Sequence, residues 1–168
     1  MTRLFKKNKI RISSMKTAES FEGKMESNLI FNAWLLQNRK ISDLINRLSD
    51  EDLKKDVAFG RNSGLYLLGH LIASNDLLLP LFGFGEKMYP EYEKIFLCCP
   101  DKCAQNFPAV KEVKSHWFAL NEHLNLKFSS LNEKQWIIED HNSNHQFKTM
   151  LSIVNHQCYH LGQLAFLL

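Results

Sequence analysis

Residues 65–82 read LYLLGHLIASNDLLLPLF, and this stretch decides the fold class. Its apolar residues cover nearly the whole circumference of a helix, which predicts a central helix that is buried on every side. Asn62 or Ser63 can cap its amino end, and the glycines that begin at residue 83 end it. One histidine, His70, interrupts the apolar run.

Three further stretches have the apolar periodicity of helices with one buried face. The first covers about residues 20–48, the next begins near Pro108, and the last begins near Thr149 and reaches the chain end. No segment of four or more residues alternates convincingly with period two. We therefore predict an all-α fold, a four-helix bundle with a long, irregular crossover over residues 84–107 between helices two and three.

Connection lengths predict the directions of these helices. About a dozen residues join helices one and two, and about as many join helices three and four, whereas the crossover is long enough to run the length of the bundle. This permits an up-down-down-up arrangement with helices two and four antiparallel. An internal echo, LSDEDL at 48–53 and LNEKQW at 131–136, is consistent with one helix pair used twice, each contributing a histidine.

Composition indicates one domain, with 168 residues of which 45% are hydrophobic. The formal charge is +3, but five basic residues lie in the first fourteen positions, and without them the charge is 3 − 5 = −2. Nucleic-acid binding would therefore depend on that tail alone. We predict a basic extension over residues 1–19 ahead of a bundle over residues 20–168. The extension is a functional arm, a disordered segment, or the result of an upstream start codon ahead of Met15.

The basic start is followed by no apolar segment typical of a secretory signal, and no run approaches the roughly eighteen apolar residues that span a bilayer. These features predict a soluble cytoplasmic protein with neither a nucleic acid nor a membrane as partner. The four cysteines form no C-x-x-C motif, which argues against a disulfide framework. Cys98, Cys99 and Cys103 could instead ligate a metal. The cysteines are Cys98, Cys99, Cys103 and Cys158.

A histidine pair in NHQCYH, residues 155–160, lies on the shoulder of the apolar stripe of the fourth helix. Because His156 and His160 are one turn apart, both imidazoles can reach one cation. With antiparallel packing, His70 would lie within about 5 Å of the height of this pair. Three desolvated imidazoles need partners for their acceptor nitrogens, and a divalent cation supplies them. We predict that these three histidines bind a metal; the alternative is ordinary core histidines bonded to carbonyls or water.

Four other residues each have a functional and a structural interpretation. Asp76 is the acidic residue nearest to a ligand and could be a general base, or an exposed helical carboxylate. Gln163, one turn after His160, could support that ligand or pack between helices. Tyr159 faces away from the histidine pair, which favours a structural role. Trp34 could line a pocket, although helical spacing favours the core.

The remaining histidines lack an apolar setting. His116 and His123 lie on the third predicted helix, whereas His141 and His145 lie in a polar stretch that we expect to be a loop. All four are expected to be exposed. His145 could also approach the mouth of a pocket.

LGHL, HQCYHLGQL and FNAWLLQNRKISDLINRLSDEDL together resemble the DinB-like family of proposed metalloenzymes, whose fourth helix carries H-x-x-x-H followed by Gly-Gln. The resemblance covers about residues 22–168. It implies an up-down-down-up bundle, often homodimeric, with a zinc or nickel site at His70, His156 and His160. Many members have Arg at the position of Leu161. Any charge interaction that this Arg makes in those members is therefore in doubt for this chain.

A metal held by three neutral ligands keeps its full double charge and an open coordination position. It could lower the pKa of bound water, bind a thiolate or polarise a carbonyl. The resemblance implies transferases that act with low-molecular-weight thiols. We therefore expect a thiol S-transferase or a hydrolase of a small substrate. A non-enzymatic metal-binding or dimerising stress-response bundle is the alternative, and a bundle without metal is a third.

Overall fold

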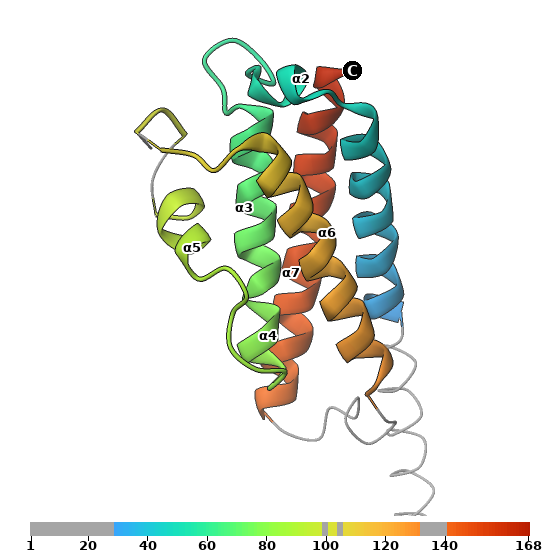
Figure 1. Cartoon of the computed structure of the whole chain (residues 1–168). Helices are drawn as coiled ribbons and strands as arrows, with labels where there is room; N and C mark the ends of the chain where they lie inside the picture. The colour runs from blue at the N-terminus through green and yellow to red at the C-terminus, as the bar shows by residue number, and fades with distance from the viewer. Residues whose placement is uncertain (1–28, 99–100, 104–105, 132–140) are drawn as a thin grey trace, which may run out of the picture.

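A computed structural model describes residues 29–98, 101–103, 106–131 and 141–168 of the chain. A first helix covers residues 29–47 of this part, and further elements follow it in chain order (Figure 1). They are α2 (Asp50–Lys54), α3 (Gly64–Asp76), α4 (Leu78–Leu81), α5 (Glu91–Phe96), η1 (Asp101–Cys103), α6 (Val110–Ser129), α7 (His141–Leu164) and η3 (Ala165–Leu167). The predicted extension over residues 1–19 lies outside the described residues.

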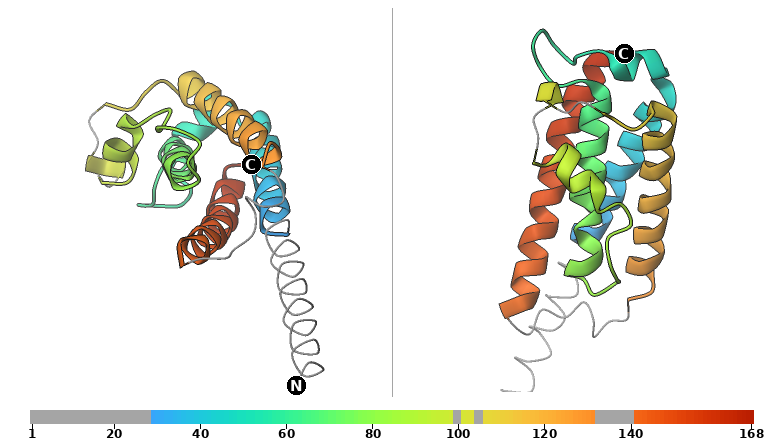
Figure 2. Two further views of the ribbon diagram at one scale, coloured as in Figure 1. Left: turned by 90° about the horizontal axis from the view of Figure 1, so that it is seen from below. Right: turned by 60° about the vertical axis from the view of Figure 1, so that its left-hand side comes forward.

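The all-α prediction is confirmed, since the described residues contain helices and one isolated bridge, between Asp56 and Ser63, but no strand. Three short helices, α2, α4 and α5, accompany the long ones, so the number of helices exceeds the four predicted. In Figures 1 and 2 the helix over residues 29–47 and α7 run in one direction, whereas α3 and α6 run in the other.

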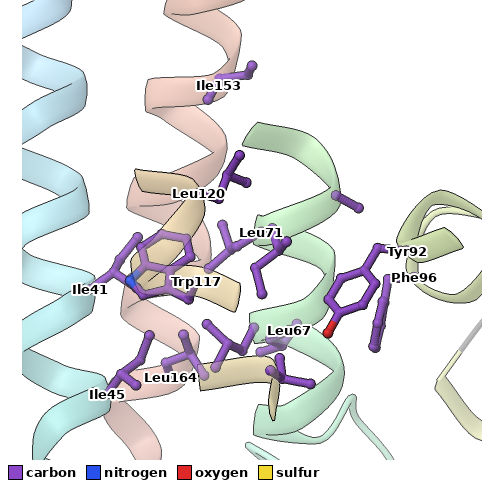
Figure 3. Close-up of a cluster of buried hydrophobic side chains, with 14 of the residues drawn as sticks. Ile41, Ile45, Leu67, Leu71, Tyr92, Phe96, Trp117, Leu120, Ile153 and Leu164 are labelled. Atoms are coloured by element: carbon purple, nitrogen blue, oxygen red, sulfur yellow. The ribbon is translucent and has the colours of Figure 1, made fainter. Parts of the chain in front are cut away.

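α3 is the central element, and it contacts α5, α6 and α7. All of its residues except His70 are buried. Figure 3 shows the reason: Ile41 and Trp117 lie on one side of α3, and Tyr92 and Phe96 of α5 lie on the other. A helix that is covered on both sides needs apolar residues around its whole circumference, as the sequence predicted.

The ends of α3 and α4 follow from local chemistry. The Ser63 side chain accepts a hydrogen bond from the Tyr66 backbone N–H, which confirms one of the two predicted caps. The predicted helix to residue 82 is interrupted at Leu77. Pro80 has no N–H to bond to the carbonyl of Asp76, four residues earlier, so the helical hydrogen-bond ladder is incomplete there.

The predicted start near Thr149 and the predicted irregular crossover are wrong in detail. α6 begins at Val110, two residues after Pro108 and close to its predicted start, whereas α7 begins at His141, eight residues before Thr149. The first turns of α7 are polar, so no apolar stripe marks them in the sequence. Within the crossover, residues 91–96 form α5 because Tyr92 and Phe96, one turn apart, are both buried.

Of the two similar segments, 48–53 and 131–136, only the first lies wholly within the described residues. There Ser49 caps α2 in a reciprocal pair, since its side chain accepts from the Asp52 backbone N–H and the Asp52 carboxylate accepts from the Ser49 backbone N–H. LSDEDL is therefore a capping box that starts a new helix. The second half begins at Leu131, which follows the end of α6.

One stretch of the described chain, Gly64–Leu81, is long and apolar enough to cross a membrane by length and composition, with a mean hydropathy of 1.2. No such stretch was expected from the sequence. Inside the protein 78% of it is buried, and core helices of soluble proteins pass the same test.

Candidate metal centre

Three histidines from two helices converge beside the core. His70 comes from α3, and His156 and His160 come from α7, which contacts α3. The Nε2 atom of His156 lies 2.8 Å from Nε2 of His70 and 2.8 Å from Nε2 of His160. Each ring offers one nitrogen, and these nitrogens all lie within 4.8 Å of one another. The sequence reasoning placed these residues together, and the structure brings them together.

The antiparallel course of α3 and α7 produces this meeting (Figure 1). The ring centroid of His70 lies 4.7 Å from that of His156 and 5.0 Å from that of His160. Within α7, the two rings are 4.4 Å apart and nearly perpendicular, at 89°. The side chain of residue 70 therefore points toward the pair.

The outer nitrogens of two of these rings have acceptors. Nδ1 of His70 donates to the backbone carbonyl oxygen of Phe96 at 2.8 Å, and Nδ1 of His160 donates to Oε1 of Gln163 at 2.6 Å. An oxygen acceptor fixes the ring proton on Nδ1 and leaves a lone pair on Nε2. This arrangement is the usual one around a metal-binding imidazole.

A count of protons shows why these residues fit a cation. With neutral rings, Nε2 of both His70 and His160 bears a lone pair, and Nε2 of His156 can carry at most one proton. At least one of the two 2.8 Å contacts therefore has no proton between its two nitrogens, and that contact is repulsive. A divalent ion between the three nitrogens would convert this repulsion into coordination. Zinc to nitrogen bonds are about 2.0–2.1 Å long, so only small shifts of the rings are needed.

Burial keeps the pair on α7 neutral. Desolvation, followed by the charges of His160 and His70, lowers the pKa of His156 from 6.5 to about 4. Desolvation also lowers the pKa of His160, although the hydrogen bond that His160 donates to Gln163 opposes this shift. Both rings are therefore neutral rather than cationic at neutral pH, and a metal would not have to displace a second proton from either ring.

Gln163 contacts a predicted ligand directly, through its bond to His160. Its Nε2 atom also donates to the hydroxyl of Tyr159 at 3.1 Å. Tyr159 is exposed, and its ring centroid lies 5.0 Å from that of His160. Gln163 therefore orients His160 from within α7, and the Tyr159 hydroxyl bonds to Gln163 rather than to His160.

Asp76 is buried, so the expectation of an exposed carboxylate is wrong. Its two carboxylate oxygens accept the backbone N–H groups of Met88 at 2.9 Å and Tyr89 at 2.8 Å. Burial raises the pKa of Asp76, although these two hydrogen bonds oppose the shift. Because both oxygens accept these bonds, Asp76 fixes the backbone of the crossover to α3 and is not available as a general base.

Two of the other four histidines, His116 and His123, are less exposed than expected. His116 is half-buried: its Nδ1 lies 2.8 Å from the Tyr92 hydroxyl, and its ring stacks on Tyr89 at 4.1 Å. His123 is also half-buried. His141 and His145 belong to α7 rather than to a loop, because that helix starts early. His145 is exposed, as predicted, and the side chain of His141 lies outside the described part.

The cysteines and Trp34 have no part in the three-histidine group. Cys98, Cys103 and Cys158 are exposed free thiols, and Cys99 lies outside the described residues. Among the described residues, the group able to hold a metal consists of histidines alone. Trp34 is fully buried against Phe128, which is the expected core position.

A buried amide network beside the site was missed by the sequence analysis. Nε2 of Gln157 donates to Asn38 Oδ1 at 2.7 Å and to Asn75 Oδ1 at 3.0 Å, and Asn75 Nδ2 donates to Asn121 Oδ1 at 3.1 Å. These bonds join four helices, and Gln157 directly follows His156 in the sequence. The available signal was a polar residue within an apolar stripe, as at Gln157 between Val154 and Leu161.

The fold and the site define a helical protein with a three-histidine group compatible with a divalent metal. Residues 17–168 match the DinB family, which is nearly the whole chain. The chain belongs to this family, as its motifs predicted. No curated protein matches the chain.

Proposed function

We propose that this protein is a divalent-metal-dependent enzyme whose metal, zinc or nickel, is bound by His70, His156 and His160. The observation that carries the proposal is the meeting of three Nε2 atoms with at most one proton among them. Membership of the DinB family supports the same conclusion.

The proposed reaction is transfer of a low-molecular-weight thiol to an electrophile, or hydrolysis of a small substrate. When bound, the ion would supply Lewis acidity and an open position for a substrate atom. The residues of the chain prepare the site: the Phe96 carbonyl orients His70, and Gln163 orients His160. Burial keeps His156 neutral and able to donate its lone pair.

A non-enzymatic metal-binding or dimerising stress-response protein is the second candidate. One observation favours it: the three-histidine group includes no carboxylate or thiol among the described residues, and the oxygens of Asp76 are bonded to the crossover. A site without an acid or base beside the metal suits storage or sensing of an ion.

The proposed setting is the cytoplasm, with a small molecule as substrate and without a nucleic-acid or membrane partner. The slightly acidic body of the chain supports this, since acidic surfaces repel phosphates and anionic lipids. Cell fractionation and gel-shift assays with DNA and RNA test it, and retention of nucleic acid by residues 20–168 would contradict it.

A homodimer through α7 is part of the proposal. Residues 149–168 contain no charged side chain, yet Leu151, Tyr159 and Phe166 are exposed. Sedimentation should give twice the mass of one chain, and Leu151→Lys should shift the protein toward monomer. A wild-type monomer at all accessible concentrations would contradict a dimer.

The decisive experiment combines metal analysis with turnover. Protein purified without an affinity tag should contain about one divalent ion per chain, and the triple variant with alanine at residues 70, 156 and 160 should contain none. Thiol conjugation of an electrophile, lost in His160→Ala, would identify the enzyme. Stoichiometric metal without turnover of any thiol or ester panel would favour the second candidate, and a metal-free wild type would contradict both.

A further inference from the structure

We infer that Gly69 and Phe96 are positioning residues for the metal site, because their close contact sets the carbonyl that orients His70. This inference rests on the proposed metal site and adds residues outside the three ligands. It makes the crossover helix α5 part of the support of the site.

The contact leaves no room for a side chain at residue 69. A Cβ atom added there would lie 2.4 Å from both Cε1 and Cζ of Phe96 and 2.6 Å from its Cδ1. Real Cβ atoms essentially never come this close to another atom. Any larger residue at 69 must therefore push the Phe96 ring away from α3.

The Phe96 ring cannot yield by itself, since it is fully buried. Aromatic rings of other residues surround it: Tyr92 at 5.0 Å, Phe107 at 5.5 Å and Tyr66 at 5.8 Å between centroids. A displaced ring must take its backbone along. The backbone that moves is the one whose carbonyl oxygen accepts from Nδ1 of His70.

The crossover is also attached to α3 on both sides of α5, which confines the movement to the α5 region. Asp76 near the end of α3 accepts from Met88 and Tyr89, and Asp101 accepts from the Ser63 backbone N–H at the other end. Between these attachments, the Phe96 contact sets how close α5 lies to α3. A shift at Phe96 therefore lengthens the bond to His70.

His70 depends on this support in a way that His160 does not. The acceptor for His160 is Gln163, three residues further along the same helix, whereas the acceptor for His70 is 26 residues away in another helix. Without the Phe96 carbonyl, the His70 ring can rotate or carry its proton on Nε2, and either change removes a ligand. Metal binding and docking of α5 should therefore be linked, so that each strengthens the other.

The test is the affinity of purified full-length variants for Co²⁺ and Zn²⁺, measured by competition with a chelator. Gly69→Ala should weaken binding about tenfold to a hundredfold, the usual cost of losing a hydrogen bond to a ligand. Gly162→Ala is the matched control, because it lies on α7 two residues after His160 and has no atom within 4 Å of its added Cβ. It should change the affinity less than twofold.

A rescue variant separates positioning from general damage. Valine has no atoms equivalent to Cδ1, Cε1 or Cζ, so Gly69→Ala combined with Phe96→Val should recover most of the lost affinity while leaving the carbonyl in place. In ¹⁵N-histidine-labelled, zinc-loaded protein, the Nδ1 proton of His70 should give a protected signal that Gly69→Ala loses and the double variant regains. A folded Gly69→Ala protein with wild-type affinity and an intact signal would overturn the inference.

Hydrogen exchange in the wild type gives an answer even if Gly69→Ala does not fold. Zinc should slow amide exchange in residues 91–98 more than in α6, and no effect on residues 91–98 would overturn the inference. A wild type that binds neither Co²⁺ nor Zn²⁺ would instead overturn the proposed function, together with this inference. Metal binding in the wild type with unchanged affinity in Gly69→Ala would overturn this inference alone.

Discussion

His70 and His156 are 86 residues apart in the chain, and their Nε2 atoms lie 2.8 Å apart in the structure. His160 approaches the same atom of His156 from the next turn of α7 at the same distance. Two nitrogens of neutral rings can share one proton at this distance, but three rings arranged in this way cannot satisfy both contacts. The expectations below follow from this shortage of protons and from the groups that surround the three rings.

Replacing a ligand should remove the stabilisation that a metal confers. Zinc at a hundredfold excess over its dissociation constant should add about 2.7 kcal/mol to the free energy of unfolding of the wild type. His160→Ala should lose this gain because only two ligands remain. Thermal unfolding with and without zinc measures it. His145→Ala, at an exposed position on the same helix, serves as control and should keep the gain.

The metal-free protein should lose stability as the pH falls from about 6.5 to about 4. Burial lowers the pKa of His156 to about 4, so within this window the unfolded chain binds a proton at residue 156 and the folded chain does not. Acid therefore favours the unfolded state. Urea unfolding with a chelator at several pH values measures the slope, and His156→Gln should flatten it. An equally steep slope in that variant would argue against this assignment.

Gln163 should affect metal affinity through His160. Gln163→Ala removes the acceptor at Nδ1 of His160, so the affinity for zinc should fall about tenfold. Tyr159→Phe is the matched control, since it removes only the hydroxyl that accepts from Gln163 and leaves the bond to His160. Chelator competition compares the two. An equal loss in both variants would mean that the hydroxyl, rather than the Gln163 oxygen, matters.

Asn75 should stabilise the fold independently of metal. Asn75→Ala removes one of the two acceptors of Gln157 Nε2 and the Asn75 donor to Asn121 Oδ1, which should lower the free energy of unfolding by about 1–3 kcal/mol. Urea unfolding of metal-free protein measures this loss. Asn155→Ala changes an exposed asparagine on α7 and should alter stability by less than about 0.5 kcal/mol. A neutral Asn75→Ala would show that the network is dispensable.

The sequence alone determined the all-helical class, the central place of α3 and the identity of the three histidines. Most of these depend on periodicity within one helix: apolar residues around a full circumference, or two histidines one turn apart. His70 was added from its apolar setting and from the antiparallel packing that the connection lengths predict. The polar start of α7 and the short α5 were missed, because an exposed turn has no apolar stripe and six residues are too few to establish a period.

Only the tertiary structure decided what surrounds the site. The acceptor for His70 is a backbone carbonyl, which every residue possesses and which therefore leaves no mark in the sequence. Asp76 is buried because the crossover covers it, and its sequence position does not show this. Gln157 is one polar residue in an apolar stripe of the sequence, whereas in the structure it bonds to two other helices. Their roles depend on segments far apart in the chain, whose relative positions are set by packing rather than by local pattern.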